Sequence, residues 1–338
     1  MADRLSAGKL PRGLLASLLD KYASPVAGVI LGPRIGEDAA AIEMADCYLV
    51  VSTDPITFAT RDIGYYAVTI NANDVVTCGA RPRWFLMTVL VPEGGTHAEV
   101  EGLFEQVDAA CRQFQVGLIG GHTEVTPGLD RPVVVGTMIG EVAKDRLVVT
   151  SGAQVGDDLL LTKGIAVEGT AILAREREGF LRSRGYAEAF IQHAQRYLYD
   201  PGISVAAEAL AAVETARVSA MHDPTEGGLS GGLYELSEAA GVGLEVDQAE
   251  ITVLDETRAL CQEFHLDPLG LIASGALLIT CRPGDRDQLL GAVRAAGVAV
   301  RHIGRVVSPS RGVVLIGPEG ERSFPAFERD EIVKSFEE

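Results

Sequence analysis

The sequence predicts a two-domain protein of mixed α and β structure, with residues 1–150 and 151–338 as the two domains. Its 338 residues exceed the size at which a single hydrophobic core stops growing, and a hydrophobic content of 47% is ample for two cores. Short apolar runs of strand length alternate with segments of helical periodicity in both halves. Each half is therefore predicted to be a sheet covered by helices.

Alternating helices and strands are expected in the first half. The predicted order is a helix over 13–22, strands near 28–31 and 47–52, a helix from about Gly64 to Cys78, a strand over 84–91, and strands at 116–120 and 132–142. On the second helix Asn71 and Asp74 share a face. Between the strands at 84–91 and 116–120, Thr96 and Glu99 form a capping box that starts an amphipathic helix.

The second half shows the same alternation. It is predicted to open with a strand over 158–162, followed by helices near 168–178, 186–198, 203–215, 229–240 and 285–296 and by strands near 244, 276 and 313. This order favours a second sheet covered by helices.

Composition excludes several classes of partner. The formal net charge of −18 repels polyphosphate, so nucleic acid is not expected as the main partner. The five widely spaced cysteines form no C-x-x-C pair and are expected to be buried free thiols in a reducing compartment. The longest apolar run, Leu269–Cys281, is too short to span a bilayer. We expect a cytoplasmic protein without membrane partners.

Five carboxylates in or beside glycine-rich or asparagine-bearing turns carry the functional prediction. They are Asp38, Asp54, Asp74, Glu124 and Asp223. Magnesium prefers a few carboxylate oxygens together with substrate phosphate, and the amides of glycine turns hold phosphates. The set therefore predicts a dispersed Mg²⁺-phosphate site. Neither a P-loop nor a dinucleotide-binding glycine motif is present, so ATP would bind in another way.

Two of these carboxylates lie in the first half outside any strong motif. Asp54 follows the apolar run Tyr48–Val51 and precedes Pro55, which predicts a position at the carboxyl end of a strand. A turn or helix-capping role is the alternative for this residue. Asp38 sits in Gly36–Ala41, where small residues allow close approach to the backbone.

The segment Gly120–Glu124 combines paired glycines with an imidazole and a carboxylate. Gly120 and Gly121 are expected to form a turn after the strand, and His122 could transfer protons near neutral pH. A structural hydrogen bond from His122 to a neighbouring loop is the alternative. Lys163, which follows a strand, could reach a phosphate as a point charge or be a solvated loop lysine.

The most specific string is His222–Leu229. Pro224 restricts Asp223, and Thr225 can cap a helix whose first turn holds Gly227 and Gly228. A helix amino terminus there would present free amides and a positive dipole to an anion. We predict a functional site with His222 as a catalytic candidate, against the alternative of a well-capped helix entry.

The ordered motifs resemble the PurM-type ATP-binding superfamily, which contains aminoimidazole ribonucleotide synthetase, selenophosphate synthetase, thiamine-monophosphate kinase and the HypE hydrogenase-maturation factors. The likeness covers nearly the whole chain and is closest to HypE-like proteins. The motifs that carry it are Gly36–Ala40, Asn73-Asp74, Gly121–Glu124 and His222–Gly228.

The resemblance implies an N-terminal αβ domain whose sheet pairs with that of a second subunit in a dimeric β-barrel, and a C-terminal α/β domain. It implies that Mg²⁺ and phosphates are bound by Asp38, Asp54, Asp74 and Asp223. Asn73, Gly120 and Gly121 would line the nucleotide site. Further cofactor-binding candidates are Glu124, Lys163, Gly227 and Gly228. The catalytic candidates are His122 and His222.

Three departures from the HypE pattern keep the reaction open. HypE proteins use a C-terminal cysteine carrying a carboxamide, whereas the last cysteine here is Cys281. Ser274 stands where HypE has a glutamate before a glycine, and Glu226 where many have arginine. The resemblance thus implies an ATP-dependent enzyme that phosphorylates an oxygen of a small or carrier-bound substrate. The alternatives are a thiamine-monophosphate-kinase-like enzyme and a non-catalytic nucleotide-binding partner in a maturation complex.

Overall fold

The computed structural model describes residues 5, 8–57 and 61–336. The chain divides into two compact units. The smaller unit comprises Ala27–Gly32 and Asp38–Leu147, and the larger unit contains the rest of the described chain, including Val148 onward. The boundary predicted at residue 150 stays a prediction.

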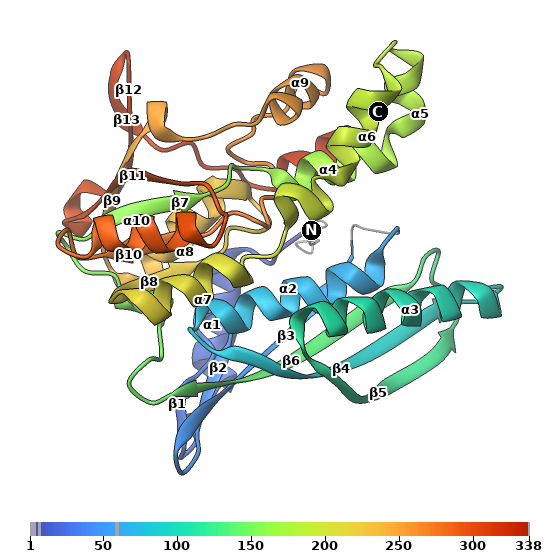
Figure 1. Ribbon diagram of the computed structural model, residues 1–338, viewed down its shortest axis with the longest axis horizontal. Helices are drawn as coiled ribbons and strands as arrows, with labels where there is room; N and C mark the ends of the chain where they lie inside the picture. Colours follow the sequence, from blue (N-terminus) through green and yellow to red (C-terminus); the bar gives the residue numbers. More distant parts are fainter. Residues whose placement is uncertain (1–4, 6–7, 58–60, 337–338) are drawn as a thin grey trace. The chain divides into compact units, whose positions relative to one another are not determined.

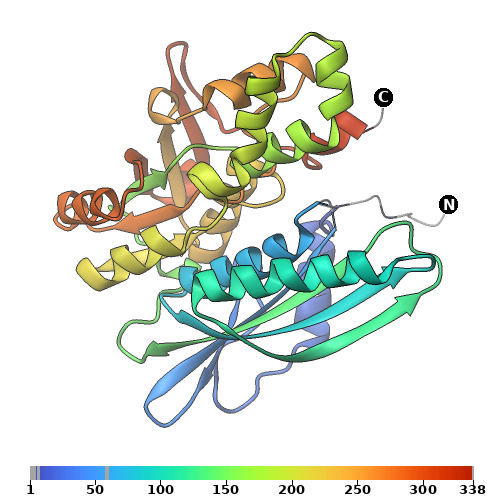
Figure 2. The ribbon, with the colours of Figure 1, turned by 45° about the vertical axis from the view of Figure 1, so that its right-hand side comes forward.

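The smaller unit is a six-stranded sheet with two helices on one face (Figures 1 and 2). In spatial order its strands are β1 (Val29–Leu31), β2 (Ala40–Glu43), β3 (Cys47–Ile56), β6 (Val133–Ala143), β4 (Arg81–Pro92) and β5 (Gly117–Thr126). All neighbouring strands are antiparallel except β4 and β5. The helices are α2 (Ile63–Thr77) and α3 (His97–Phe114).

Helix α2 lies against the sheet and is buried along its whole length, whereas α3 is amphipathic. The α3 capping box forms as predicted: the Thr96 hydroxyl accepts from the Glu99 amide, and the Glu99 carboxylate accepts from the Thr96 amide. This arrangement satisfies amides that would otherwise have no partner in the first turn.

The larger unit contains a seven-stranded mixed sheet. Its spatial order is β13 (Gly320–Ser323), β12 (Val313–Gly317), β9 (Gly243–Asp247), β11 (Val300–Val307), β7 (Asp158–Thr162), β10 (Leu278–Cys281) and β8 (Val218–His222). Strands β9 and β12 are parallel, and the other neighbours are antiparallel.

The larger unit also contains helices, which are labelled in Figure 1. They are α1 (Arg12–Tyr22), α4 (Val167–Glu176), α5 (Glu178–Ser183), α6 (Glu188–Arg196), α7 (Ala206–Thr215), α8 (Gly228–Ala240), α9 (Asp255–Glu263) and α10 (Arg286–Ala295). Single turns occur at η1 (Thr150–Gly152), η2 (Leu198–Gly202), η3 (Gln248–Glu250), η4 (Pro309–Arg311) and η5 (Glu331–Phe336). Apolar residues of β7, β9, β10 and α8 form one hydrophobic core.

Two positional predictions in the smaller unit were wrong. Asp54 lies inside β3, not at the end of a strand, because β3 pairs with β6 all the way to Ile56. Strand β2 pairs with β3 only as far as Val51. Pro55 therefore lies beyond the end of β2, where its missing N–H group removes no hydrogen bond to that strand. The neighbours of β3 are antiparallel, so the rule for carboxyl ends of parallel strands does not apply.

The segment Gly120–Glu124 is not a turn either, because it continues β5 in parallel pairing with β4. Gly121 makes this possible with a φ of +145°, and a Cβ at this position would lie 1.9 Å from the Met87 carbonyl oxygen. The glycine therefore serves the close approach of two strands.

Candidate functional site

In the smaller unit, polar groups of β3 and α2 meet where the helix contacts the strand. Asn71 Oδ1 accepts a hydrogen bond from the Asp54 amide at 2.9 Å, and its Nδ2 donates to the Asp54 carbonyl at 3.3 Å. The Ser52 hydroxyl donates to Asp74 Oδ2. Asn73 and Asp74 are both buried. The predicted residues Asp54, Asn73 and Asp74 therefore come from two adjacent elements, and carboxylate and amide oxygens suit a hard cation.

The other predicted residues of this unit are exposed. Asp38 precedes β2 and is exposed, as are Gly120, Gly121, His122 and Glu124 on β5. His122 Nε2 lies 3.0 Å from Glu124 Oε2, and this hydrogen bond lowers the pKa of Glu124. His122 thus pairs within its own strand and not with a neighbouring loop.

In the larger unit, the His222 motif links the end of β8 to α8. His222 and Asp223 are each 1% exposed. His222 Nε2 lies 3.1 Å from Glu235 Oε2, and Lys9 Nζ lies 3.4 Å from Glu235 Oε1. Burial opposes ionisation of Glu235, but the hydrogen bond from His222 and the charge of Lys9 outweigh it and lower the pKa to about 2. Glu235 therefore stays ionised and holds both basic groups.

The entry to α8 differs from the prediction in two ways. The N-cap is Gly227, not Thr225, because Gly227 and Gly228 adopt left-handed φ angles of 83° and 65° between Thr225 and the helix. The Thr225 hydroxyl instead accepts from Lys9 Nζ at 3.2 Å.

The amides expected to be free for an anion have protein partners. Gly227 N–H donates to Asp330 Oδ2 at 2.7 Å, Gly228 N–H to the Thr225 carbonyl at 3.1 Å and Ser230 N–H to the Leu269 carbonyl at 2.9 Å. An anion at this turn would have to displace Asp330, so the expectation of free amides was wrong for these three groups.

Three carboxyl groups surround this turn and have raised pKa values. Burial raises the pKa of Glu168 to about 7, and the charges of Asp330 and Glu226 add to this. Burial likewise raises the pKa of Asp330 to about 6 against three backbone hydrogen bonds, and it raises the pKa of Glu226 against the charge of Lys9. Burial therefore favours the neutral form of all three carboxyl groups, which share this turn with Lys9.

Two family models match most of the chain. The model described as AIR synthase related protein, N-terminal domain, matches residues 36–142, and the corresponding C-terminal domain model matches residues 154–317. Carbamoyl dehydratase HypE of Cupriavidus necator is 33% identical over 291 residues, which cover 83% of this chain and 80% of the relative. The chain belongs to the AIR synthase related family. Within it, the chain is HypE-like, as the motifs predicted.

Solved structures share this fold. A HypE in complex with ATP has a TM-score of 0.69 at 24% identity and covers 97% of this chain and 98% of its own. AaThiL complexed with AMPPCP and TMP has a TM-score of 0.73 at 20% identity, covering 93% and 94%. A HypE–HypF complex has a TM-score of 0.72 at 21% identity, covering 93% and 99%. These likenesses confirm the two-domain PurM-like fold of the HypE-like chain.

Lys163 is not a solvated loop lysine in the HypE-like chain. Its side chain is 5% exposed, and Nζ lies 2.9 Å from Glu208 Oε1 and donates to the Ser204 carbonyl at 2.5 Å. Glu208 thus neutralises its charge in a buried ion pair. The prediction that Lys163 holds a phosphate stays a prediction, and such a phosphate would have to replace this pair.

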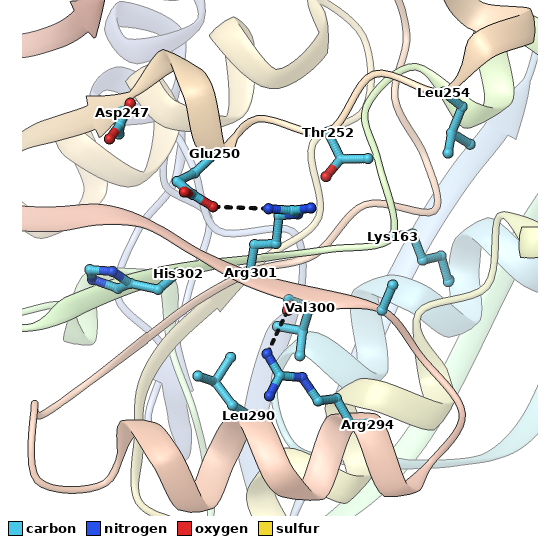
Figure 3. Close-up of a pocket in the computed structure, with 11 residues that line it drawn as sticks. Lys163, Asp247, Glu250, Thr252, Leu254, Leu290, Arg294, Val300, Arg301 and His302 are labelled. Atoms are coloured by element: carbon cyan, nitrogen blue, oxygen red, sulfur yellow. Dashed lines mark hydrogen bonds and ion pairs between the residues drawn. The ribbon is translucent and has the colours of Figure 1, made fainter.

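A cavity of about 870 Å³ lies on the larger unit beside Lys163 (Figure 3). It contains no other predicted site residue. Its charged groups are largely paired: Arg301 donates to Glu250 at 3.1 Å, Arg294 to the Val300 carbonyl at 3.4 Å, and His302 Nε2 lies 3.2 Å from Asp158 Oδ1. We assign the functional site to the motifs and not to this cavity.

No group of three or more histidine, cysteine or acidic side chains in the described residues is arranged to hold a metal ion. Magnesium keeps several waters and takes further oxygens from substrate phosphates, so one or two carboxylates of the chain suffice for it. None of the helices described is long and apolar enough to cross a bilayer.

Sequence reasoning missed four side chains around the His222 motif. They are Lys9, Glu168, Glu235 and Asp330. Lys9 lies near the start of the sequence, and Glu168 lies five residues after the predicted site residue Lys163. Glu235 could have been predicted from its spacing in the sequence, because it lies two turns into the helix that follows the motif. No local signal marks Asp330, which reaches the turn only through the fold.

Proposed function

We propose that the chain is a Mg-ATP-dependent, HypE-like enzyme that activates an oxygen of a small or carrier-bound substrate by phosphorylation. The candidates for binding magnesium and phosphates are Asp38, Asp54, Asp74 and Asp223, and Asn73 is the candidate for lining the nucleotide site. ATP supplies the phosphoryl group. The observation that carries this proposal is the contact between β3 and α2 in a chain of the AIR synthase related family, where Asn73 and Asp74 are buried on the helix and Asn71 holds the backbone of Asp54.

A second candidate function is a small-molecule kinase. Cys281 lies in β10, is fully buried, and burial raises the pKa of its thiol to about 12. A thiol of this kind cannot act as a mobile carrier of a carboxamide. This favours a small-molecule phosphoryl acceptor, because a kinase of this kind needs no carrier cysteine.

The test is the thermal stability of the protein with ATP and Mg²⁺, alone and together. A site filled to about 100 times its dissociation constant adds roughly 2.7 kcal/mol to the free energy of unfolding. We expect a Mg-dependent rise in the melting temperature of the wild type that Asp223→Asn abolishes. Asp287→Asn, which changes a side chain that is 86% exposed on α10, is the matched control and should keep the rise.

The outcomes separate the candidate functions. If no nucleotide raises the melting temperature, the nucleotide site is refuted. If ATP binds but no ADP forms with any acceptor, the catalytic proposal fails and a non-catalytic partner in a maturation complex remains. If both aspartate variants keep the full rise, Asp223 is not part of the site.

A further inference from the structure

The strongest unassigned feature of the molecule is the carboxyl group of Glu168. It is the second residue of α4 and is only 6% exposed. The entry to α4 is tightly held, because Ala166 takes a left-handed φ of 57° and Gly169 N–H donates to the Ile272 carbonyl at 3.0 Å. The backbone on both sides of Glu168 is therefore held in place.

In the part of the chain that the structure describes, only one of the two oxygens of the Glu168 carboxyl group accepts hydrogen bonds. Ser274 donates to it from both its hydroxyl and its backbone amide. Oε2, by contrast, is buried and accepts no hydrogen bond from the described residues. A buried polar atom without a partner costs about 1–3 kcal/mol, so its retention calls for a function. A reactant that brings a proton to Oε2 would remove this penalty.

The carboxyl group lies beside the His222 motif. Ala273, next to Ser274, donates its N–H to the Thr225 carbonyl at 3.2 Å, and Asp330 and Glu226 act on Glu168 through their charges. Lys9 is the cation that acts on Glu226. The pKa of Glu168, raised to about 7 mainly by burial, is near the value at which a carboxylate both accepts and releases a proton.

We propose that Glu168 is the general base of the phosphorylation and that the acceptor is a hydroxyl group. This inference rests on the proposed function. As the acceptor oxygen attacks the terminal phosphorus of ATP, the new O–P bond forms and the bond from phosphorus to the bridging oxygen breaks. The electron pair leaves with ADP, and the hydroxyl proton passes to Glu168 Oε2. Ser274 is a positioning residue that orients the carboxylate.

The test compares Glu168→Gln with the wild type in ADP release from Mg-ATP, with water as the hydroxyl acceptor. Loss of a general base lowers kcat by about 100-fold or more, and the rise in melting temperature with Mg-ATP should remain. The control is Glu245→Gln, a glutamate 7% exposed on β9 that pairs with Arg305 and Arg311 away from the motif. It should retain wild-type kcat.

A second variant reports on the proton itself. Ser274→Ala keeps the carboxyl group but removes a hydrogen bond that lowers its pKa, so the acid limb of the pH–kcat profile should move to higher pH. A merely structural serine would not move this limb. If Glu168→Gln does not fold, the Ser274→Ala profile decides alone.

The results distinguish the inference from the proposal beneath it. Wild-type kcat in Glu168→Gln, or an unmoved limb in Ser274→Ala, overturns the base role while the ATP-dependent enzyme stands. A wild type that neither binds nor turns over Mg-ATP overturns the proposed function and the base role together.

Discussion

At the residue scale, buried carboxyl groups make the stability of the larger unit depend on pH. Burial raises the pKa of Glu168 to about 7 and that of Asp330 to about 6. A carboxyl group with a raised pKa binds its proton more tightly in the folded state. Its stabilising contribution is therefore complete below the unfolded pKa of about 4 and is lost as the pH rises through the folded pKa. Glu235, with its pKa lowered to about 2, loses its contribution only in acid.

We therefore predict that the free energy of unfolding falls between about pH 4 and pH 7, with Glu168 contributing on the order of 3 kcal/mol. Glu168→Gln and Asp330→Asn should each flatten this dependence, because neither amide can ionise. Urea denaturation across this pH range measures it, and Asp287→Asn, which changes an exposed carboxylate on α10, should keep the wild-type slope. An unchanged slope in both variants would show that these carboxyl groups are not protonated in the folded state.

At the element scale, the path of β5 depends on one glycine. A Cβ on Gly121 would lie 1.9 Å from the Met87 carbonyl oxygen of β4, and its φ of +145° is unfavourable for other residues. Gly120 is a matched control, because a Cβ there meets only Leu86 Cδ2 at 3.7 Å. We predict that Gly121→Ala lowers the free energy of unfolding by about 3 kcal/mol or more, whereas Gly120→Ala changes it little.

Chemical denaturation of the two variants checks this prediction. Equal stability of Gly120→Ala and Gly121→Ala would mean that β4 and β5 separate at this point without cost. The comparison also separates a structural from a nucleotide-binding role of the pair, because a stable Gly120→Ala with weakened Mg-ATP binding would support the predicted role of Gly120.

Local patterns sufficed for the elements that carry strong periodicity or a cap. The capping box of α3, the buried strand β4 and the helix α2 follow from such signals. β2, β8, β11 and β13 were missed, and each of them depends on pairing within its sheet. Asp54 was placed wrongly for the same reason, since β3 extends as far as its pairing with β6.

The site was predictable only where its residues lie in compact motifs. His222 and Asp223 are in one string, and Asn73 and Asp74 are adjacent on one helix. Asp330 accepts a hydrogen bond from the amide of Gly227, which lies 103 residues earlier in the sequence. No pattern within a window of the sequence links two such residues, so these partners emerge only from the fold.

At the scale of the whole molecule, β5 is the edge of its sheet and almost entirely exposed. Leu118, Ile119 and Val125 are 41%, 56% and 64% exposed on it. A long apolar edge strand invites pairing with another chain unless it is covered. This supports the expected homodimer, in which the edges of two copies meet. The net charge of −18 on each copy opposes association, so salt should strengthen the dimer.

We predict that the protein is a dimer in solution and that Ile119→Lys, which places a charge on this edge, yields monomers. Val155→Lys is the matched control, because Val155 is 60% exposed but belongs to the larger unit. Sedimentation equilibrium over a range of protein concentrations and salt measures both variants. Dissociation by Ile119→Lys with a dimeric Val155→Lys would assign the interface to β5. A monomeric wild type at all concentrations would exclude the dimer, and a dimer that survives Ile119→Lys would move the interface to another surface.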